Sequence, residues 1–299
     1  MNLIAMLITL GTESLWKSFR AVRPYQWLVD YTAWLWQRVG SERWFGRPSG
    51  VVLALAPGVL VVGLIQLALA SGEGFIAWLI KLAFAVAVLI VSIGVRSIEP
   101  ELGEYRRALE RDDTDAAYLH VRELLREGPP ANPGEMNRTL IEVMLIRNNE
   151  RLLAILFWFA LIGPVGAVLY RSICQLKGIR QSGNVMSPDF LDSVLRIHAV
   201  LDWIPARITA VCYAIIGSFV EAMQQWRAAA QNWNTDLYTG NRLVLINSGL
   251  GALRLVNLEA GRENTALRDD IIDAEALINR TVIVWLTAFA LLTIAGWLS

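Results

Sequence analysis

Cysteine and histidine are both scarce, with two residues of each among 299. Cys174 and Cys212 lie in apolar segments and have neither the spacing of a disulfide framework nor that of a metal site. The motifs of phosphate-binding loops, dinucleotide-binding folds and zinc hydrolases are missing as well. We therefore expect no disulfide, no bound metal and no cofactor, and the sequence offers no catalytic residue of those classes.

Charge is also sparse, and it is balanced. The chain has 27 Lys and Arg against 27 Asp and Glu, which together make up 18% of the residues. In soluble domains about a quarter of the residues are charged. A neutral chain without a basic excess predicts no nucleic-acid partner. The first residues are apolar, but they lack the basic leader and small-residue cleavage site of a signal peptide.

Long apolar runs are what the sequence has in abundance. Apolar residues make up 55% of the chain, the mean hydropathy is +0.43, and there are twelve Trp residues. Several windows stay apolar for about 20 residues, which is enough to cross a bilayer. This composition predicts an all-α, multi-pass integral membrane protein with kinked or broken helices and a small cytoplasmic helical segment. The lipid bilayer is its first expected partner.

The distribution of charge divides the chain and orients it. The hairpin loop 71–74 has no Lys or Arg, whereas residues 1–50 carry six and residues 96–151 carry nine Arg. The positive-inside rule therefore places the N-terminus and residues 96–151 in the cytoplasm. The predicted segments are a basic and aromatic juxtamembrane segment (1–50), a transmembrane hairpin (51–95), a cytoplasmic helical segment (96–151), kinked membrane segments (152–219), a polar helical segment (220–279) and a last transmembrane helix (280–299).

Gly163 and Pro164 interrupt the third apolar run, 152–173. They either kink a spanning helix or make the segment re-enter the membrane, and the two alternatives put residues 171–199 on opposite sides. Pro205 likewise predicts a break or kink at 202–204, followed by a second helix from about 205 to 219. That helix carries a ladder of small residues that lets another helix approach closely: Ala206, Ala210, Ala214 and Ser218.

The polar segment after residue 220 contains two further patterns. Gly249, Gly251 and Gly261 are expected to break its helices. An acidic group follows, and it reads either as a Mg²⁺ site or as a solvated helix start before the last span, the second being the interpretation we favour. Its members are Asp269, Asp270, Asp273 and Glu275.

Polar residues next to the apolar segments are the candidate site. Asp202 and Arg207 are either a helix cap with a snorkelling Arg or part of a functional site at the membrane face. We expect both to converge with Arg171 and Glu142 on one cytoplasmic-side pocket, where the planar arginine forks would suit an anionic ligand. The candidate ligand-binding residues are Glu142, Asn148, Asn149, Tyr170, Arg171, Asp202 and Arg207.

Four stretches of this chain resemble the AmpE/CobD (CbiB) membrane family, most clearly from Glu142 onward. LFWFALIGPVGAVLYR at 156–171 is similar to the apolar segment of the family, and DWIPARITAV at 202–211 to its most specific motif. SGLGALRL at 248–255 and DDIIDAEALINR at 269–280 resemble its glycine-rich and acidic C-terminal stretches. The resemblance covers most of the chain and implies a multi-pass membrane protein.

The family has two branches, and departures from one of them favour the other. The synthase branch carries Asn-Thr-Leu-Asp after the Tyr-Arg pair, whereas this chain has Cys174-Gln175-Leu176-Lys177, so that Lys177 stands in place of a carboxylate. An ammonium group cannot bind a metal or serve the same acid–base role. The Asp-Pro…Pro-His-Pro opening of the synthases is missing, and Ile155 replaces one of their prolines. These differences favour the AmpE branch.

Three functional hypotheses follow. The leading one is an AmpE-like regulator of β-lactamase induction and the cell-wall stress response, without catalysis, that binds a small anionic or cell-wall-derived ligand and a membrane or cytoplasmic protein. The alternative is an adenosylcobinamide-phosphate synthase of the CobD/CbiB type, an ATP-dependent, amide-forming enzyme. The third, a transporter-like module, rests on the broken helices alone.

Overall fold

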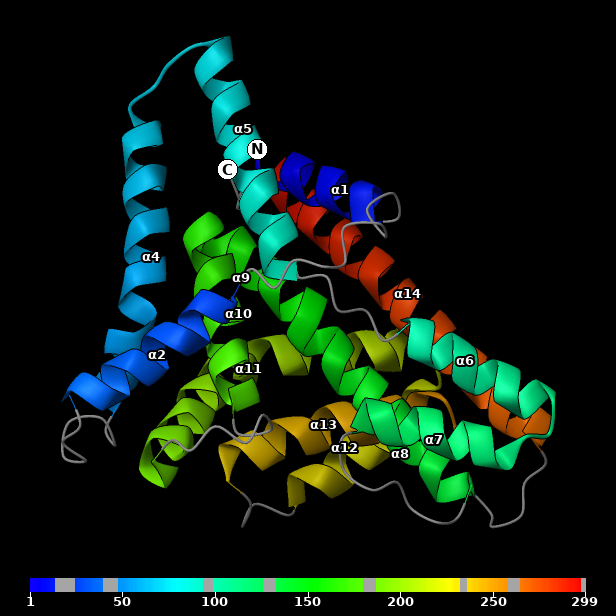
Figure 1. Cartoon of the computed structure of the whole chain (residues 1–299). Coiled ribbons are helices and arrows are strands. Elements are labelled where there is room, and N and C mark those ends of the chain that lie inside the picture. Colours follow the sequence, from blue (N-terminus) through cyan, green and yellow to red (C-terminus); the bar gives the residue numbers. More distant parts are fainter. Residues whose placement is uncertain are drawn as a thin grey trace. The chain divides into compact units, whose positions relative to one another are not determined.

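The computed structural model is helical throughout the part of the chain that it describes. Every regular element there is a helix, as the sequence predicts (Figure 1). The described residues are 1–13, 25–39, 48–93, 99–125, 133–179, 187–231, 236–256 and 264–296. Gly261 and most of the Trp- and Arg-rich positions before residue 48 lie outside these ranges.

The chain forms two compact units, each with its own buried core. Helices α11 (Pro188–Ile216) and α14 (Asn264–Ile294) contribute residues to both. The first unit comprises Met1–Val95, Glu150–Trp203 and Leu286–Ser299, and the second comprises Arg96–Asn149 and Ile204–Trp285.

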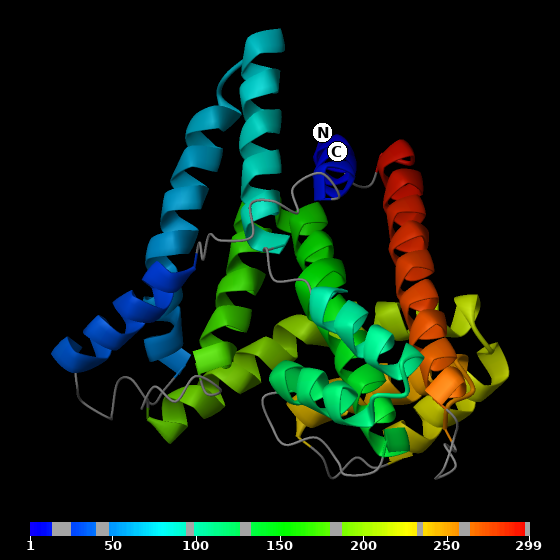
Figure 2. The same ribbon diagram turned by 45° about the vertical axis from the view of Figure 1, so that its right-hand side comes forward.

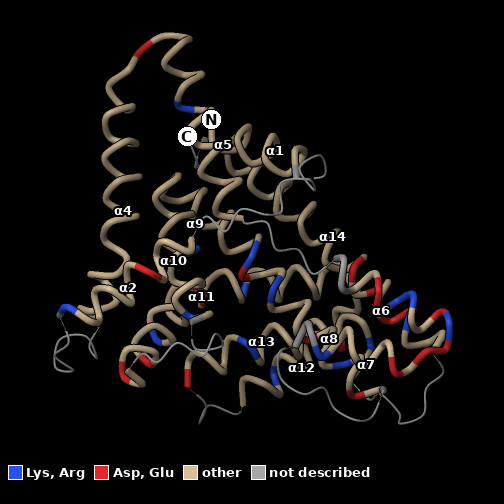
Figure 3. Tube along the Cα trace, viewed as in Figure 1, with Lys and Arg blue, Asp and Glu red and all other residues tan. Residues whose placement is uncertain are grey.

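Four of the described helices are long and apolar enough to cross a membrane: α4 (Pro48–Ala70), α5 (Phe75–Ile93), α11 and α14. The first two are the predicted hairpin, and α14 contains the predicted last span but begins well before Arg280. Figure 3 shows the tube of α4 free of charged residues. Together with the family resemblance, these helices make the chain a multi-pass membrane protein.

Helices α4 and α5 form a hairpin (Figure 2), and Lys81 of α5 binds its loop. The Lys81 ammonium group donates hydrogen bonds to the carbonyl oxygens of Ala70, at 3.2 Å, and Gly72, at 2.9 Å. Both carbonyls lie at the C-terminal end of α4, where backbone acceptors lack helical donors. Lys81 therefore extends from its apolar helix toward the loop, as a snorkelling lysine does.

Two further helices of the first unit are α1 (Asn2–Glu13) and α2 (Gln26–Val39). Helix α1 packs on α5, and α2 packs on α4 and α10 (Pro164–Ile179). Tyr25, Leu28 and Phe190 are buried in the core of this unit.

The interruption at Gly163 is a sharp turn between two short helices, α9 (Ala154–Ile162) and α10. Gly163 has a φ of 74°, a left-handed conformation that glycine adopts without steric cost. Beyond the turn the two helices touch, because a Cβ on Gly166 would lie 2.2 Å from the carbonyl oxygen of Trp158. Neither helix alone is among those long enough to span, and the choice between a kinked span and a re-entrant segment stays a prediction.

Gln66 of α4 satisfies the backbone groups that this turn leaves without helical partners. Its side-chain nitrogen donates to the carbonyl oxygen of Ile162, and its side-chain oxygen accepts from the N–H of Val165, both at 3.3 Å. Unsatisfied backbone groups are costly at apolar depth and are tolerated only where protein supplies partners. One amide side chain thus stabilises both sides of the turn.

The predicted helix break at 202–204 is wrong, because α11 continues through Pro205 as one helix. Proline has no N–H, so the carbonyl of Leu201 loses its helical donor. The indole Nε1 of Trp158 donates a hydrogen bond to that carbonyl at 3.1 Å. A donor from another helix therefore replaces the missing one, and the helix is not interrupted.

The small-residue ladder on α11 faces protein. Ala206, Ala210 and Ala214 are fully buried in the second unit, whereas Val211 is 41% exposed. The helix thus has a packed face of small residues and an exposed apolar face, as expected where one side meets protein and the other meets lipid.

Four helices of the second unit form two pairs: α6 (Glu99–Glu110) with α7 (Thr114–Leu125), and α12 (Phe219–Gln231) with α13 (Leu237–Ala252). The first pair lies in the segment 96–151, which the sequence predicts to be helical. Its Tyr105 hydroxyl donates to the Asn137 side chain at 3.1 Å, and Asn137 donates to the carbonyl of Leu267 at 3.2 Å. Burial raises the pKa of Tyr105 above its ordinary value, which keeps the hydroxyl protonated as a donor.

The expected breaks at Gly249 and Gly251 are also wrong, since both residues lie inside α13. Their role is close packing. A Cβ on Gly249 would meet the Leu145 side chain at 2.4 Å, and one on Gly251 would meet the Cα of Ala222 at 2.8 Å. The helix tolerates two glycines because their missing side chains let α8 (Pro133–Asn148) and α12 approach.

The acidic group lies along α14 and does not precede a separate helix. Asp270 is buried, and Glu275 pairs with Arg106 at 2.7 Å. Among the described residues, no group of three His, Cys, Asp or Glu side chains is placed to hold a metal ion.

Candidate functional site

The seven predicted site residues are divided between the two units. Tyr170, Arg171 and Asp202 belong to the first unit. The second unit holds Glu142, Asn148, Asn149 and Arg207. Their convergence on one pocket therefore stays a prediction, and the contacts within each unit decide what each residue does locally.

Asp202 is bound to Tyr170 inside the first unit. The Tyr170 hydroxyl donates to Asp202 Oδ1 at 2.7 Å. Tyr170 is 0% exposed and Asp202 is 3% exposed. Hydrogen bonds to an ionised carboxylate are short and about twice as strong as neutral ones. Since α11 does not begin or break here, Asp202 is not a helix cap. It is one half of a buried polar contact between α10 and α11.

A second carboxylate, Glu150, lies in the same unit within a π-helical turn, η2 (Asn149–Leu153), that joins α8 to α9. Lys177 donates a hydrogen bond to Glu150 Oε1, and the two side chains are only 14% and 16% exposed. His198 Nε2 lies 3.8 Å from the same oxygen. Single π-turns occur frequently at functional sites, where they re-aim a side chain.

These residues make up the inner polar cluster: Glu150, Tyr170, Lys177, His198 and Asp202. The rings of Tyr170 and His198 lie 5.8 Å apart, which connects the two bonded pairs. Helical spacing explains the grouping, since Tyr170 and Lys177 are seven residues apart on α10, and His198 and Asp202 are four apart on α11. Side chains from three helical elements thus gather within one unit.

Arg171 points to a different set of partners. With the Gln175 amide assigned so that its oxygen faces the guanidinium, that oxygen accepts from Arg171 Nε at 3.2 Å and Nη2 at 2.9 Å. The guanidinium carbon also lies 6.0 Å from the centre of the Tyr25 ring, within reach of a cation–π contact. Arg171 is therefore anchored beside the cluster by an amide and an aromatic ring.

In the second unit the predicted residues form separate polar contacts. Arg207 Nη1 donates to Asn241 Oδ1 at 2.9 Å, and the Thr209 hydroxyl donates to Asn149 Oδ1 at 2.8 Å. Asn148 donates to the Tyr213 hydroxyl at 3.4 Å. The first contact joins α11 to α13, and the other two join the start of η2 and the end of α8 to α11.

Glu142 accepts from Arg138 Nε at 3.0 Å along α8, and Arg138 also donates to the carbonyl of Val256 at 3.3 Å. This is a helical ion pair that also tethers the end of α13. It gives Glu142 a structural partner within its own unit.

Sequence reasoning missed two members of the inner polar cluster, Lys177 and His198. A third, Glu150, was grouped with Asn148 and Asn149 as a candidate but is not among the seven predicted residues. Lys177 was considered only as a departure from the synthase pattern. His198 drew no functional hypothesis. The signal that finds them is spacing, because all three share a helical face or a turn with a predicted residue. The π-turn that aims Glu150 inward has no recognisable sequence pattern.

The chemistry available to the cluster is that of one ion pair and one hydrogen-bonded carboxylate. One carboxylate faces an ammonium group, and the other accepts a phenol hydroxyl. Buried charges arranged in this way need their partners, since removing one leaves an uncompensated charge at a cost of several kcal/mol. The cluster is therefore suited to holding helices in one arrangement, or to exchanging a partner when a charged ligand or proton arrives.

Comparison with known proteins finds relatives that carry two different names, CobD and AmpE. A family model described as CobD/Cbib protein matches residues 4–237. The cobalamin biosynthesis protein CobD of Stutzerimonas stutzeri is 28% identical over 88% of this chain and 84% of its own length. That of Chromobacterium violaceum is 28% identical over 69% of this chain and 70% of its own.

A relative with the second name is similar over a comparable length. Protein AmpE of Shigella flexneri is 26% identical over 80% of this chain and 82% of its own length. No solved structure matches.

Proposed function

Since this chain belongs to the CobD/CbiB protein family, we propose that it is a regulatory membrane protein of the AmpE type, which acts by binding rather than by catalysis. Its role is in β-lactamase induction and the cell-wall stress response, and its place is the bacterial inner membrane. Its partners are the bilayer, a small anionic or cell-wall-derived ligand and a membrane or cytoplasmic protein.

Identity to relatives does not choose between the branches, because the CobD and AmpE relatives are 26–28% identical over comparable lengths. The choice rests on residues. The observation that carries the proposal is the partly buried ion pair between Lys177 and Glu150. The resemblance places a carboxylate of the synthases at position 177, and here the ammonium group neutralises the nearest carboxylate instead.

This arrangement does not fit the Mg²⁺ and ATP that an amide-forming synthase must hold. Magnesium is bound through one or two carboxylates together with phosphate oxygens. In the inner polar cluster Glu150 is bonded to Lys177, and Asp202 accepts from Tyr170. Both carboxylates would have to leave buried partners before either could bind a metal. A binding role requires no such rearrangement.

The proposal is tested in a strain that lacks the gene, by measuring β-lactamase activity before and after a sub-inhibitory β-lactam. We expect loss of the gene to alter induction and the wild-type chain to restore it. Tyr170→Phe combined with Asp202→Asn should fail to restore it at equal membrane abundance. Arg196→Gln is the matched control, because Arg196 is exposed on the same helix. Unaltered induction in the deletion strain would refute the regulatory role.

The predicted shared pocket is tested in the same assay. Arg171→Lys and Arg207→Lys keep the charge and lose the planar fork that grips an anion at two points. Under the pocket hypothesis both variants fold normally and lose regulation. If both fold and retain full activity, the residues serve only the local contacts described above.

A second candidate is the synthase of cobalamin biosynthesis, which the names and coverage of two CobD relatives favour. Purified protein is incubated with ATP, Mg²⁺, adenosylcobyric acid and aminopropanol phosphate, and the condensed product is sought by mass spectrometry. Product formation that depends on Glu150 would reverse the ranking of the two functions.

A further inference from the structure

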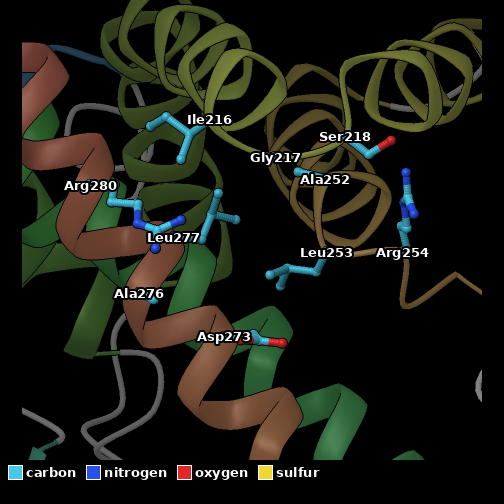
Figure 4. Close-up of a pocket in the computed structure, with 10 residues that line it drawn as sticks. All are labelled: Ile216, Gly217, Ser218, Ala252, Leu253, Arg254, Asp273, Ala276, Leu277 and Arg280. Carbon is cyan, nitrogen blue, oxygen red and sulfur yellow. The ribbon is translucent and has the colours of Figure 1, made fainter.

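A cavity of about 340 Å³ lies within the second unit, away from every predicted site residue. It opens between the end of α11, the start of α12, the end of α13 and the middle of α14 (Figure 4). Small-molecule sites have volumes from about 300 Å³ upward. Its wall is made of Ile216, Gly217, Ser218, Ala252, Leu253, Arg254, Asp273, Ala276, Leu277 and Arg280.

The floor of the cavity is built by close backbone packing. The N–H of Ser218 donates to the carbonyl of Ala252 at 2.9 Å. A Cβ on Gly217 would lie 2.5 Å from the same carbonyl oxygen. The segment between α11 and α12 is therefore held directly against the end of α13, which fixes the position of the wall.

Arg254 occupies a backbone position that normally belongs to glycine. Its φ is 58°, and the bonds from Arg254 N to Gly251 O and from Leu255 N to Leu250 O form the two-bond C-terminal motif in which glycine is the usual residue. A non-glycine residue there costs roughly 1 kcal/mol. An arginine in this strained position, with its side chain at the cavity, indicates that its charge has a function.

The charges around the cavity nearly balance. Arg254 Nε pairs with Glu221 at 2.9 Å, and Figure 4 shows its side chain directed toward Ser218. Asp273 and Arg280 are seven residues apart on α14, so they share a face about 10 Å apart along the axis. Within the described chain, neither has a hydrogen bond or ion pair to a protein group. A ligand with one negative and one positive group would match this pattern.

Exposed apolar residues lie within three positions of the wall residues along the chain, and we call them the apolar rim. Ile215, Phe219, Val220 and Ile283 are each more than half exposed. Arg280 is also the last charged residue of the sequence, and residues 208–220 carry no charge. Two chain segments thus change from charged to uncharged at the same cavity. That change marks the level of lipid headgroups, where arginine meets phosphate and apolar side chains meet acyl chains.

We propose that this cavity binds the headgroup of a phospholipid that carries a primary amine. Arg280 and Arg254 hold the phosphate, and Asp273 accepts hydrogen bonds from the ammonium group. The exposed apolar rim contacts the acyl chains, which a soluble phosphate ester lacks. The lipid then ties α14 to the α12–α13 pair. This inference is independent of the regulatory proposal.

The test uses full-length protein, stripped of lipid in mild detergent and returned to defined lipids, with bound lipid counted by native mass spectrometry. Phosphatidylethanolamine should bind about tenfold more tightly than phosphatidylcholine, because a trimethylated amine donates no hydrogen bond to Asp273. Asp273→Asn should abolish this preference, and Arg280→Gln should weaken the binding of both lipids about tenfold. Arg107→Gln is the control, because that arginine is exposed on α6 of the same unit.

Unchanged thermal unfolding of the variants shows that they fold. The proposal is overturned if Arg280→Gln binds lipid as well as Arg107→Gln does. It is also overturned if phosphatidylglycerol binds more tightly than phosphatidylethanolamine, which would indicate a purely anionic site. Free phosphoethanolamine that competes at the same concentration as the lipid would make the ligand a soluble phosphate ester and would equally end the lipid proposal.

Discussion

Replacing Gly251 by alanine should destabilise the second unit, although alanine is the better helix former. The new Cβ would lie 2.8 Å from the Cα of Ala222 and from the carbonyl oxygen of Glu221, both of them backbone atoms of α12. Ordinary Cβ contacts begin at 3.4 Å, so α12 and α13 must separate by at least 0.6 Å at this point. A gap of that size loses a quarter to a half of the dispersion energy of each pair along the interface.

The magnitude follows from two opposing effects. Overpacking costs about 1–3 kcal/mol, and backbone against backbone belongs near the upper end because no side chain can turn aside. Helix propensity returns about 1 kcal/mol. The net loss of unfolding free energy is therefore about 2 kcal/mol, which lowers the Tm of a chain of this size by roughly 4–8 °C.

Gly103→Ala is the matched control. Gly103 lies in α6 of the same unit, and a Cβ there would meet nothing within 4 Å. It gains the helix propensity without the clash, so its Tm should rise by roughly 2–4 °C. Both variants are measured by intrinsic tryptophan fluorescence during heating in one detergent. If Gly251→Ala raises the Tm as Gly103→Ala does, the contact between α12 and α13 is not as close as the structure has it.

Four further predictions follow from the described contacts. Ala210→Leu should lower the Tm, because a larger side chain at a fully buried position costs about 1–3 kcal/mol. Val211→Leu on the exposed face should leave the Tm unchanged within experimental error. Equal Tm values for the two variants would refute the packed ladder. Trp158→Phe should lower the free energy of unfolding by about 1 kcal/mol, because it leaves the Leu201 carbonyl without a donor. The loss should be smaller in a Pro205→Ala background, where a backbone N–H returns. An equal loss in both backgrounds would remove the explanation for the unbroken α11. Asp236 caps α13 by accepting from the N–H of Thr239, and hydrogen bonds from the Thr239 side chain and backbone hold the pKa of Asp236 below its ordinary value. The stability that the cap adds is therefore present above the ordinary carboxyl pKa and is lost as the pH falls through the lower folded-state pKa. Asp236→Ala should cost about 1 kcal/mol at pH 7 and progressively less below about pH 4, as followed by Tm against pH. A cysteine placed at Asp113 should resist membrane-impermeant maleimides in intact cells, because the positive-inside rule predicts that residues 96–151 are cytoplasmic. Labelling from the periplasm would reverse the predicted orientation.

Short sequence patterns predicted the helices and turns that depend only on neighbouring residues. The hairpin at 71–74 and the α6–α7 pair follow from hydropathy and from helical periodicity. The break at 202–204 failed because the residue that prevents it, Trp158, lies 43 positions away in sequence. The breaks at Gly249 and Gly251 failed for a related reason. Glycine in a helix signals either an end or a close neighbour, and only the packing partner distinguishes the two.

The candidate site was predicted in part for the same reason. Tyr170 and Asp202 were identified from their place beside apolar segments, and the structure joins them directly. Lys177 was recognised as a substitution, but its partner was not, because Glu150 is aimed inward by a π-turn. Pairings between helices depend on rotation about each helix axis, and one extra residue in a turn changes that rotation by about 100°.

The amide of Gln66 has a consequence for the order in which the protein is made. It serves a turn 96 residues later in the chain, so at 5–20 residues per second it leaves the ribosome about 5–20 s before the backbone groups that it will bind. Gln66 is therefore already synthesised when the turn at Gly163 forms. A circularly permuted chain that begins after α4 would reverse this order, and its α9–α10 turn would be exposed to lipid until synthesis ended. Such a chain should be degraded during biogenesis even if its finished fold were as stable as that of the natural one.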